Sequence, residues 1–149
     1  MTPRQSGPRT NQATRLLADR GLTPTAARIR VLQQLLAADS AVTHQQLQQS
    51  VERGDNPIDK VTLYRVLEWL VEQGLVHSVT GQDRVRHFSL IGSQDAHAHF
   101  ECLNCGRLFC LQGLPALSDL AVPTGFVQEQ FDITVRGRCA DCALAPLAR

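Results

Sequence analysis

Apolar residues recur every three or four positions through much of residues 11–73. This period is typical of amphipathic helices, and we expect four of them, over residues 11–20, 26–38, 44–51 and 60–73. Thr25, Thr43 and Asp59 are suitable N-cap residues for the last three helices. Gly21 and Gly74 are placed to end the first and the last helix, because glycine readily adopts the left-handed conformation that follows a helix.

The period changes after residue 74, where β-branched and aromatic residues over 75–79 and 84–90 flank a turn at 80–83. This pattern predicts a β-hairpin. Further strands are expected over 97–103, 107–112 and 126–137, with a short helix over 114–121. The sequence therefore predicts an α+β protein with a flexible arm over residues 1–12, a winged helix-turn-helix domain over 13–90, a hinge over 91–96 and a small α/β domain over 97–149.

Composition narrows the setting in which the protein works. The chain has 149 residues, of which 43% are hydrophobic, so it is long enough to bury a core. No apolar run approaches the roughly 18 residues that a membrane helix needs, and the polar start does not resemble a signal peptide. We therefore expect a cytoplasmic protein without a membrane partner. In that reducing compartment, paired cysteines more often bind metal or carry out redox chemistry than form static disulfides.

Four of the five cysteines form two Cys-x-x-Cys pairs, Cys102 with Cys105 and Cys139 with Cys142. Two such pairs supply the four sulfur ligands that a structural zinc ion requires. Gly106 relieves the tight turn after the first pair, and the second pair follows the last expected strand. The sequence therefore predicts one structural zinc site, with a thioredoxin-like redox pair or buried thiols as the alternatives.

The helix expected over 60–73 is the candidate DNA-recognition helix. Its first turns carry Lys60, Thr62, Tyr64 and Arg65 on the polar side, where they can reach base edges and phosphates in a major groove. Arg84 and Arg86 on the hairpin would contact the DNA backbone beside the groove. Residues 1–90 carry 11 basic and 8 acidic side chains, a net charge of +3, whereas residues 91–149 carry 4 and 6, a net charge of −2. This mild asymmetry is consistent with DNA binding by the first half.

The motifs, taken in order, resemble the ferric uptake regulator family of bacterial metal-sensing repressors. They are Gly21 to Leu32, Thr62-Leu63-Tyr64-Arg65-Val66-Leu67, Gly74-Leu75-Val76 and the two Cys-x-x-Cys pairs. The family's usual Thr-Val-Tyr-Arg is Thr-Leu-Tyr-Arg here. The resemblance implies a homodimer that binds double-stranded palindromic operator DNA when loaded with metal and blocks transcription. It also implies that Tyr64 reads bases, and that Arg28 and Arg65 contact DNA or support its contacts.

A second metal site is expected to carry the regulation. His97 and His99 lie at i and i+2 of an expected strand and so share one face, and both align with ligands of the resembled family. Cys110 stands where relatives carry a carboxylate, and a thiolate beside imidazoles suits zinc better than iron or manganese. By the same resemblance His77 matches a hinge ligand of zinc uptake regulators, and His87 lies near another ligand position.

Some ligand assignments stay open at this stage. His44 is a reserve ligand, and Glu101 shares the strand face of His97 and His99 and is either a ligand or a partner of one. The hinge carboxylate of relatives is Ser89 here. A further family site is expected to be absent, because its aligned positions are Ala96, Ala98, Leu117 and Phe131. We therefore expect two zinc ions per subunit, one structural and one regulatory.

The sequence favours a zinc sensor that controls zinc uptake genes, and it leaves alternatives. Within the same family the chain could sense iron, manganese or redox state, with Cys110 as the sensing thiol. In a different class it could be a zinc-dependent enzyme or a Cys-x-x-Cys redox protein. Against an enzyme, no Asp or Glu stands at a spacing that makes it a clear general base beside the ligands, although Glu101 is close in sequence. We expect no catalytic residues and no small organic substrate.

Overall fold

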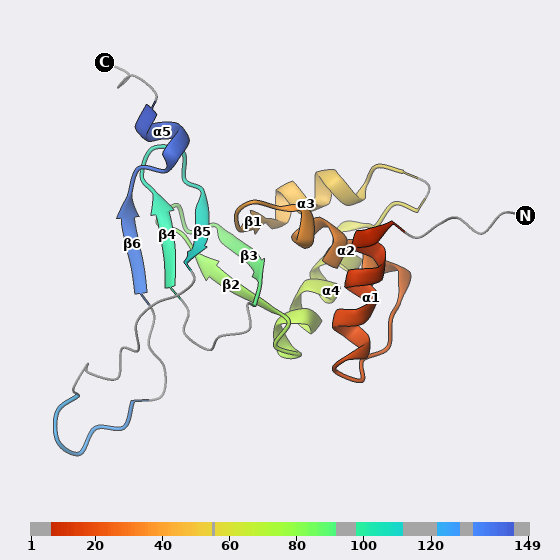
Figure 1. The fold of residues 1–149 in the computed structure, drawn as a ribbon, viewed down its shortest axis with the longest axis horizontal. Coiled ribbons are helices and arrows are strands. Elements are labelled where there is room, and N and C mark those ends of the chain that lie inside the picture. The colour runs from red at the N-terminus through yellow and green to blue at the C-terminus, as the bar shows by residue number, and fades with distance from the viewer. Residues whose placement is uncertain (1–6, 55, 92–97, 112–121, 129–132, 145–149) are drawn as a thin grey trace, which may run out of the picture. The chain divides into compact units, whose positions relative to one another are not determined.

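The computed structural model describes residues 7–54, 56–91, 98–111, 122–128 and 133–144. The chain divides into two compact units, residues 1–91 and 92–149 (Figure 1). The division falls at the start of the expected hinge, and residues 92–96 of that hinge lie outside the described part. No helix in the described ranges is both long enough and apolar enough to span a membrane.

The first unit has the expected helices and hairpin, and one additional short strand. In chain order its elements are α1 (Pro8–Ala18), α2 (Ala26–Ala37), β1 (Val42–Thr43), α3 (His44–Val51), α4 (Lys60–Glu72), β2 (Val76–Thr80) and β3 (Arg86–Leu90). The strands form an antiparallel sheet in the order β1-β3-β2. Helices followed by such a hairpin make a winged helix, as the sequence predicts.

The first helix begins earlier than expected. Residues 8–12 were expected to belong to a flexible arm, yet α1 starts at Pro8. Proline favours the first turn of a helix because its fixed φ suits that position and its missing N–H has no partner to lose there. The backbone N–H groups of Thr10 and Asn11 donate to the Gly7 carbonyl, so these polar residues form the first turn without apolar periodicity.

The three expected N-caps are present. The Thr25 hydroxyl accepts a hydrogen bond from the Arg28 backbone N–H at 3.2 Å. Thr43 forms a reciprocal capping box with Gln46, with bonds of 2.9 and 3.1 Å. The carboxylate of Asp59 accepts from the backbone N–H groups at the start of α4. Each cap satisfies donors that have no partner inside the helix, so the starts of α2, α3 and α4 are confirmed.

A single apolar cluster holds the first unit together. It draws residues from all four helices and from both long strands, and Leu17, Leu32, Leu67 and Phe88 are essentially inaccessible to solvent. Because the apolar stripe of α4 is packed into this cluster, its opposite side faces outward. The expected recognition residues are thus presented on a rigid element.

The second unit contains a three-stranded sheet with a short helix after it. The elements are β4 (Ala98–Cys102), β5 (Leu108–Leu111), β6 (Ile133–Gly137) and α5 (Ala140–Leu144). The strand order is β5-β4-β6, with β4 antiparallel to β5 and parallel to β6. The helix expected over 114–121 lies outside the described residues.

The last strand is shorter than the sequence suggested. Residues 126–128, expected to belong to it, are exposed and outside any strand, because the Phe126 backbone N–H closes a turn by donating to the Pro123 carbonyl at 3.1 Å. The strand itself starts at Ile133. Helix α5 has five residues, too few for an apolar period, and was not expected.

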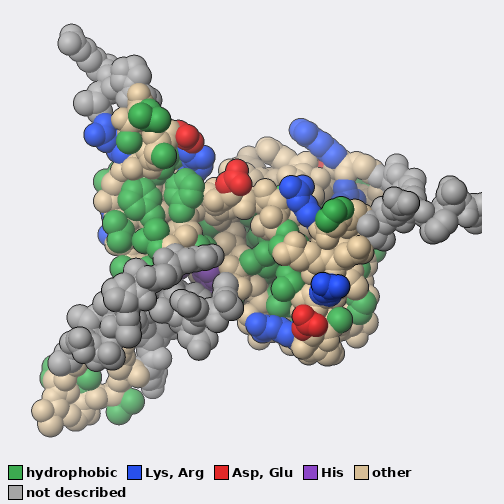
Figure 2. Space-filling view, in the orientation of Figure 1, with side chains coloured by type: hydrophobic (Ala, Val, Ile, Leu, Met, Phe, Trp, Pro, Cys, Tyr) green, Lys and Arg blue, Asp and Glu red, His purple; other side chains and the backbone are tan. Residues whose placement is uncertain are grey.

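The two faces of this sheet differ in chemistry. Side chains alternate between faces along a strand, so Phe100, Phe109 and Val135, which are paired across the three strands, share one face. His99 and Cys110, also paired, share the other. Hydrophobic side chains gather over this sheet in the space-filling view (Figure 2), and Val135 is 45% exposed. The sheet therefore has a partly exposed apolar face and a face that carries the candidate metal ligands His99 and Cys110.

Candidate metal centre and nucleic-acid interface

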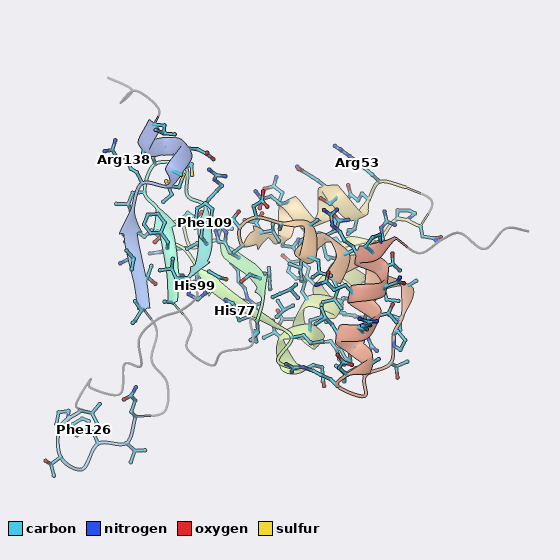
Figure 3. All side chains as sticks on the ribbon, in the orientation of Figure 1. Arg53, His77, His99, Phe109, Phe126 and Arg138 are labelled. Carbon is cyan, nitrogen blue, oxygen red and sulfur yellow. The ribbon has the colours of Figure 1, made fainter. Side chains whose placement is uncertain are left out.

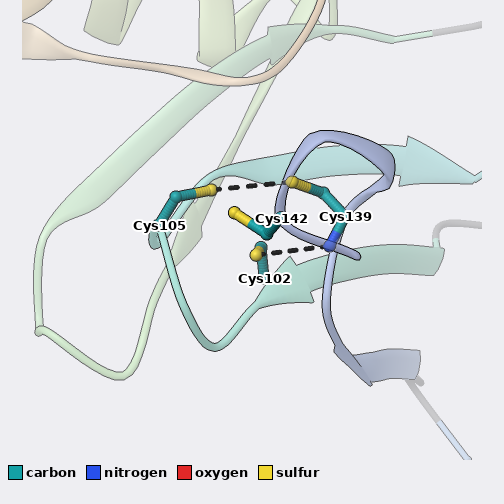
Figure 4. A group of neighbouring side chains, drawn as sticks. All are labelled: Cys102, Cys105, Cys139 and Cys142. Carbon is teal, nitrogen blue, oxygen red and sulfur yellow. Dashed lines mark hydrogen bonds between the residues drawn. The ribbon is translucent and has the colours of Figure 1, made fainter. Parts of the chain in front are cut away.

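The four cysteines meet because of how the strands of the second unit pair. Cys102 ends β4, and Cys105 lies in the turn that leads to β5. Because β6 runs parallel to β4, with Gly137 beside Cys102, its carboxyl end lies at the same edge of the sheet. Cys139 follows that end directly, and the first turn of α5 carries Cys142 to the same place (Figure 4).

The geometry of this cluster fits a tetrahedral zinc ion. All four sulfur atoms lie within 4.8 Å of one another, and the sulfurs of Cys105 and Cys139 are 3.8 Å apart. Zinc–sulfur bonds of about 2.3 Å at tetrahedral angles require sulfurs about 3.8 Å apart. Gly106 makes the tight first turn possible, since its φ of 74° belongs to the left-handed region. The prediction that these four residues come together is confirmed.

Backbone hydrogen bonds prepare the first of these thiols for a metal. The pKa of Cys102 is lowered to about 6, chiefly by the backbone N–H of Cys105 and then by that of Cys139, which donates to the sulfur at 3.3 Å. For Cys142 a hydrogen bond from Asn104 lowers the pKa, but Cys139 and burial outweigh it and raise the value to about 11. Four thiolates so close together repel each other, so full ionisation requires a cation among them.

Arg107 and Asp141 add a polar shell that the sequence analysis missed. Arg107 donates from Nε to the sulfur of Cys105 at 3.4 Å and from Nη2 to the sulfur of Cys139 at 3.3 Å. Its Nη2 also donates to the Asp141 carboxylate at 2.6 Å. These contacts raise the pKa of the guanidinium, Asp141 first among them. The available signal was an arginine placed directly after Cys-x-x-Cys-Gly.

Two of the expected regulatory ligands face each other within the second unit. His99 on β4 and Cys110 on β5 are direct cross-strand partners, and an imidazole nitrogen and the sulfur lie within 4.8 Å of each other. His99, labelled in Figure 3, is 3% exposed. His97 lies outside the described residues. The pair offers one nitrogen and one sulfur donor to a metal.

Glu101 forms an ion pair within the sheet of the second unit. It is 6% exposed, and its Oε2 accepts a hydrogen bond from Nε of Arg136 on the neighbouring strand at 3.1 Å. A buried carboxylate paired with a guanidinium is stabilised where it lies. Of the two roles left open for Glu101, the ion pair favours that of a partner beside His99 over that of a ligand.

The two candidate ligands of the first unit share the outer face of the hairpin. His77 on β2 pairs with Ser89, and His87 lies two residues before Ser89 on β3; by alternation both point away from the face that carries Phe88 into the core. The Ser89 hydroxyl lies 3.1 Å from Nε2 of His77. His87 is 6% exposed, and neither of its ring nitrogens has a hydrogen-bond partner among the described residues.

The candidate recognition side chains differ in how freely they can meet DNA. Lys60, Tyr64 and Arg65 on α4 and Arg84 at the hairpin turn are exposed. The Thr62 hydroxyl instead donates to the Asp59 carboxylate, and Arg86 is paired with Glu68. The first four residues therefore present their polar groups to solvent, whereas the last two hold local structure.

Arg28 has structural contacts of its own. Its Nη1 donates to the Thr23 carbonyl at 2.7 Å, and its guanidinium lies 3.5 Å from the ring centroid of Trp69 on α4. These contacts join the start of α2 to the recognition helix. They favour the supporting role among the two that the resemblance implies for Arg28.

Comparison with known proteins identifies the family to which this chain belongs. The model of the ferric uptake regulator family matches residues 19–115, about two thirds of the chain. The chain belongs to this family. It is therefore a metal-responsive, DNA-binding transcription regulator with a winged helix, as the sequence predicts, and its relatives are regulators and not enzymes.

Individual relatives sense different signals. This regulator is 30% identical to the zinc uptake regulation protein of Escherichia coli (strain K12), an alignment that covers 88% of this chain and 79% of that protein. It is 27% identical to the peroxide operon regulator of Bacillus subtilis (strain 168), with coverage of 89% and 92%. Its fold matches a zinc uptake regulator complexed with zinc and DNA at a TM-score of 0.69 and 26% identity, covering 95% and 97% of the two chains.

Proposed function

We propose that this protein is a zinc-responsive repressor that acts as a homodimer on palindromic operator DNA of zinc uptake genes in the cytoplasm. Each subunit would hold two zinc ions. The structural ion binds Cys102, Cys105, Cys139 and Cys142, and the regulatory ion draws its ligands from His77, His87, His97, His99 and Cys110. DNA would be contacted through Lys60, Tyr64, Arg65 and Arg84, while Arg28 and Thr62 support the recognition helix.

The pairing of His99 with Cys110 is the observation that favours zinc over other metals as the regulatory ion. Sulfur with imidazole suits zinc, whereas manganese prefers oxygen ligands and ferrous iron in regulatory sites is held by harder donors. Glu101, a carboxylate on the same face of β4 as His99, is paired with Arg136. The likeness to zinc uptake regulators supports the same choice.

The buried state of His87 supports its inclusion in the ligand set. An imidazole removed from water without hydrogen-bond partners is destabilising, and coordination of one ring nitrogen by a metal would compensate for this. His77 has a different advantage, since the Ser89 hydroxyl near Nε2 fixes the orientation of the ring. Ligands from the hairpin and from β4 and β5 would make the regulatory ion a link between the two units.

That link supplies a mechanism for repression. Two recognition helices bind one operator only when their spacing matches half-sites about 34–36 Å apart. A dimer whose first units are free to reorient would seldom match both half-sites at once, so a metal that fixes the hinge raises affinity. The partly exposed apolar face around Phe100, Phe109 and Val135 supports the second unit as the dimer contact.

Fluorescence anisotropy with a DNA duplex tests this proposal. The duplex would first be selected from a random-sequence library by the zinc-loaded protein, and affinity would then be measured with zinc, manganese or ferrous iron added to protein that retains only the structural zinc. We expect strong binding with zinc alone. Equal affinity with and without added zinc would contradict the switch, and stronger binding with manganese or iron would assign the sensor to that metal.

Redox sensing through Cys110 is the alternative function, and the similarity to the peroxide operon regulator supports it. Alkylation of Cys110, with the other four cysteines protected by zinc, separates the two cases. If zinc is the signal, the alkylated protein loses zinc-dependent DNA binding and peroxide has no further effect. If redox state is the signal, peroxide releases the unmodified protein from DNA at constant free zinc.

A further inference from the structure

His44 lies against the residue that the proposed function places on the DNA bases. The imidazole of His44, at the start of α3, stacks on the phenol ring of Tyr64 on α4, with ring centroids 3.7 Å apart and an angle of 17° between the planes. This is a nearly parallel stack between two adjacent helices of the helix-turn-helix. It covers one face of Tyr64, while the residue as a whole stays 44% exposed.

The surroundings of the imidazole disfavour its charged form. Burial, and then the positive charge of Lys60, lower the pKa of His44, while a hydrogen bond to the Lys60 backbone acts in the other direction. Its Nε2 is buried and has no hydrogen-bond partner among the described residues. A side chain held in this way offers Tyr64 a flat surface in place of water.

The backbone around His44 is fixed as well. The preceding residue, Thr43, both caps α3 through the capping box with Gln46 and pairs with His87 in the wing sheet. The ring of His44 is therefore presented from a point anchored on two sides. Tyr64 extends from the second turn of a helix whose inner side is buried in the core, so both partners of the stack start from rigid elements.

We propose that His44 is a positioning residue that sets the orientation of Tyr64 and thereby the sequence specificity of DNA binding. An exposed tyrosine on a helix samples several rotamers, and fixing one of them before binding lowers the entropic cost of placing it against a base. The proposal rests on the proposed function, because it concerns the same recognition surface. It assigns to His44 a role in DNA reading in place of the reserve metal ligand that the sequence suggested.

Three substitutions at position 44 separate stacking from folding. His44→Ala removes the ring, His44→Gln removes the ring but keeps a polar side chain, and His44→Phe keeps a ring without the buried nitrogen. Gln49→Ala, at an exposed position of the same helix, is the matched control. Because an aromatic stack stabilises the arrangement of its two rings, we expect His44→Ala and His44→Gln to lose about threefold to tenfold in affinity for the selected duplex. His44→Phe and the control should bind it as the wild type does.

Measurements on a scrambled duplex and on Tyr64 itself complete the test. Lys and Arg contacts to phosphates do not depend on the stack, so affinity for scrambled DNA should stay constant across all variants. The chain has a single tyrosine, so the NMR signals of a selectively labelled tyrosine ring report this residue alone. These signals should change with Ala and Gln and persist with Phe, at unchanged far-ultraviolet circular dichroism spectra.

The outcomes distinguish the inference from the proposed function. The inference is overturned if His44→Ala and His44→Gln keep the wild-type ratio of selected to scrambled affinity, or if His44→Phe loses specificity as they do. It is also overturned if the effects of His44→Ala and Tyr64→Ala simply add in the double variant. If the zinc-loaded wild type selects no DNA sequence at all, the proposed function fails instead, while the tyrosine signal still tests the stack.

Discussion

Each of the two units of this regulator is stabilised internally by a different kind of interaction. The first has a large apolar cluster that joins four helices to a hairpin. In the described part of the second unit the buried apolar residues are Ala98, Cys102, Leu108 and Cys139, and two of these four belong to the proposed structural zinc site. Because the described residues of this unit include few buried apolar side chains, we expect the unit to depend on its zinc ion for stability. Zinc would thus stabilise one unit in the way that a hydrophobic core stabilises the other.

The largest expected effect comes from removing a structural ligand. Cys139→Ser should abolish tight zinc binding and unfold the second unit, because zinc binding supplies much of the folding free energy of such sites. Zinc content and amide hydrogen exchange would be measured on the full chain. Strands β4, β5 and β6 should lose protection while α2 and α4 keep theirs. Cys110→Ser is the control that keeps the structural zinc, and retained protection in β4 to β6 of Cys139→Ser would refute the contrast.

A cavity in the core of the first unit should give the converse result. Leu67 is fully buried, and Leu67→Ala should lower the free energy of unfolding of the first unit by about 2–5 kcal/mol. Urea denaturation followed by the fluorescence of Trp69, the single tryptophan, measures this. Zinc content should stay unchanged. Val61→Ala, at a position 57% exposed, should have little effect, and a loss of zinc from Leu67→Ala would show that the units are not independent.

The cap of the recognition helix should have a smaller effect that depends on pH. Asp59→Ala removes the acceptor for two backbone N–H groups and should lower the melting temperature by about 4–8 °C, whereas Asp59→Asn should retain most of the cap. Hydrogen bonds from Thr62 lower the pKa of Asp59 below its usual 3.8. The stabilisation is therefore complete above pH 3.8 and is lost as the pH falls through the lowered value. Equal melting temperatures for the wild type and Asp59→Ala at pH 7 would contradict this.

The surface ion pair of the wing should matter least. Arg86 and Glu68 are 41% and 47% exposed, and exposed pairs contribute about 0–1 kcal/mol because water screens them. Glu68→Gln should therefore change the free energy of unfolding by less than about 1 kcal/mol. The guanidinium freed by this change could reach a phosphate, so DNA affinity should rise slightly or stay constant. A marked drop in affinity would show that the pair orients the wing.

Local signals in the sequence predicted most of the first unit. Thr25, Thr43 and Asp59 cap helices where expected, because a cap depends on residues only two or three positions away. Strand β1 was missed, since two residues show no alternation and their pairing with Phe88 and His87 is set by the tertiary fold. The start of α1 was placed too late because its first turn has no buried side chain before Ala13.

The metal centre was predictable from spacing, but its surroundings were not. Two Cys-x-x-Cys pairs predict a zinc site from their spacing alone. The parallel pairing of β4 with β6, which brings the two pairs together, is a long-range feature that spacing does not predict. The contacts of Arg107 with two sulfurs depend on that pairing, and so does the ion pair of Glu101 with Arg136. The stack of His44 on Tyr64 joins positions 20 residues apart on different helices, so it leaves no local signal in the sequence. Without that signal, His44 was expected only as a reserve ligand.

Titration of one sample with buffered free zinc tests the central claim most directly. Bound zinc per chain and affinity for the selected duplex would be recorded together at each zinc concentration. The account predicts that the structural site fills first without DNA binding, and that affinity then rises in step with a second zinc ion that Cys110→Ser fails to bind. DNA affinity that rises with the first zinc ion alone, or that is independent of zinc, would contradict the separation of structural and regulatory metal.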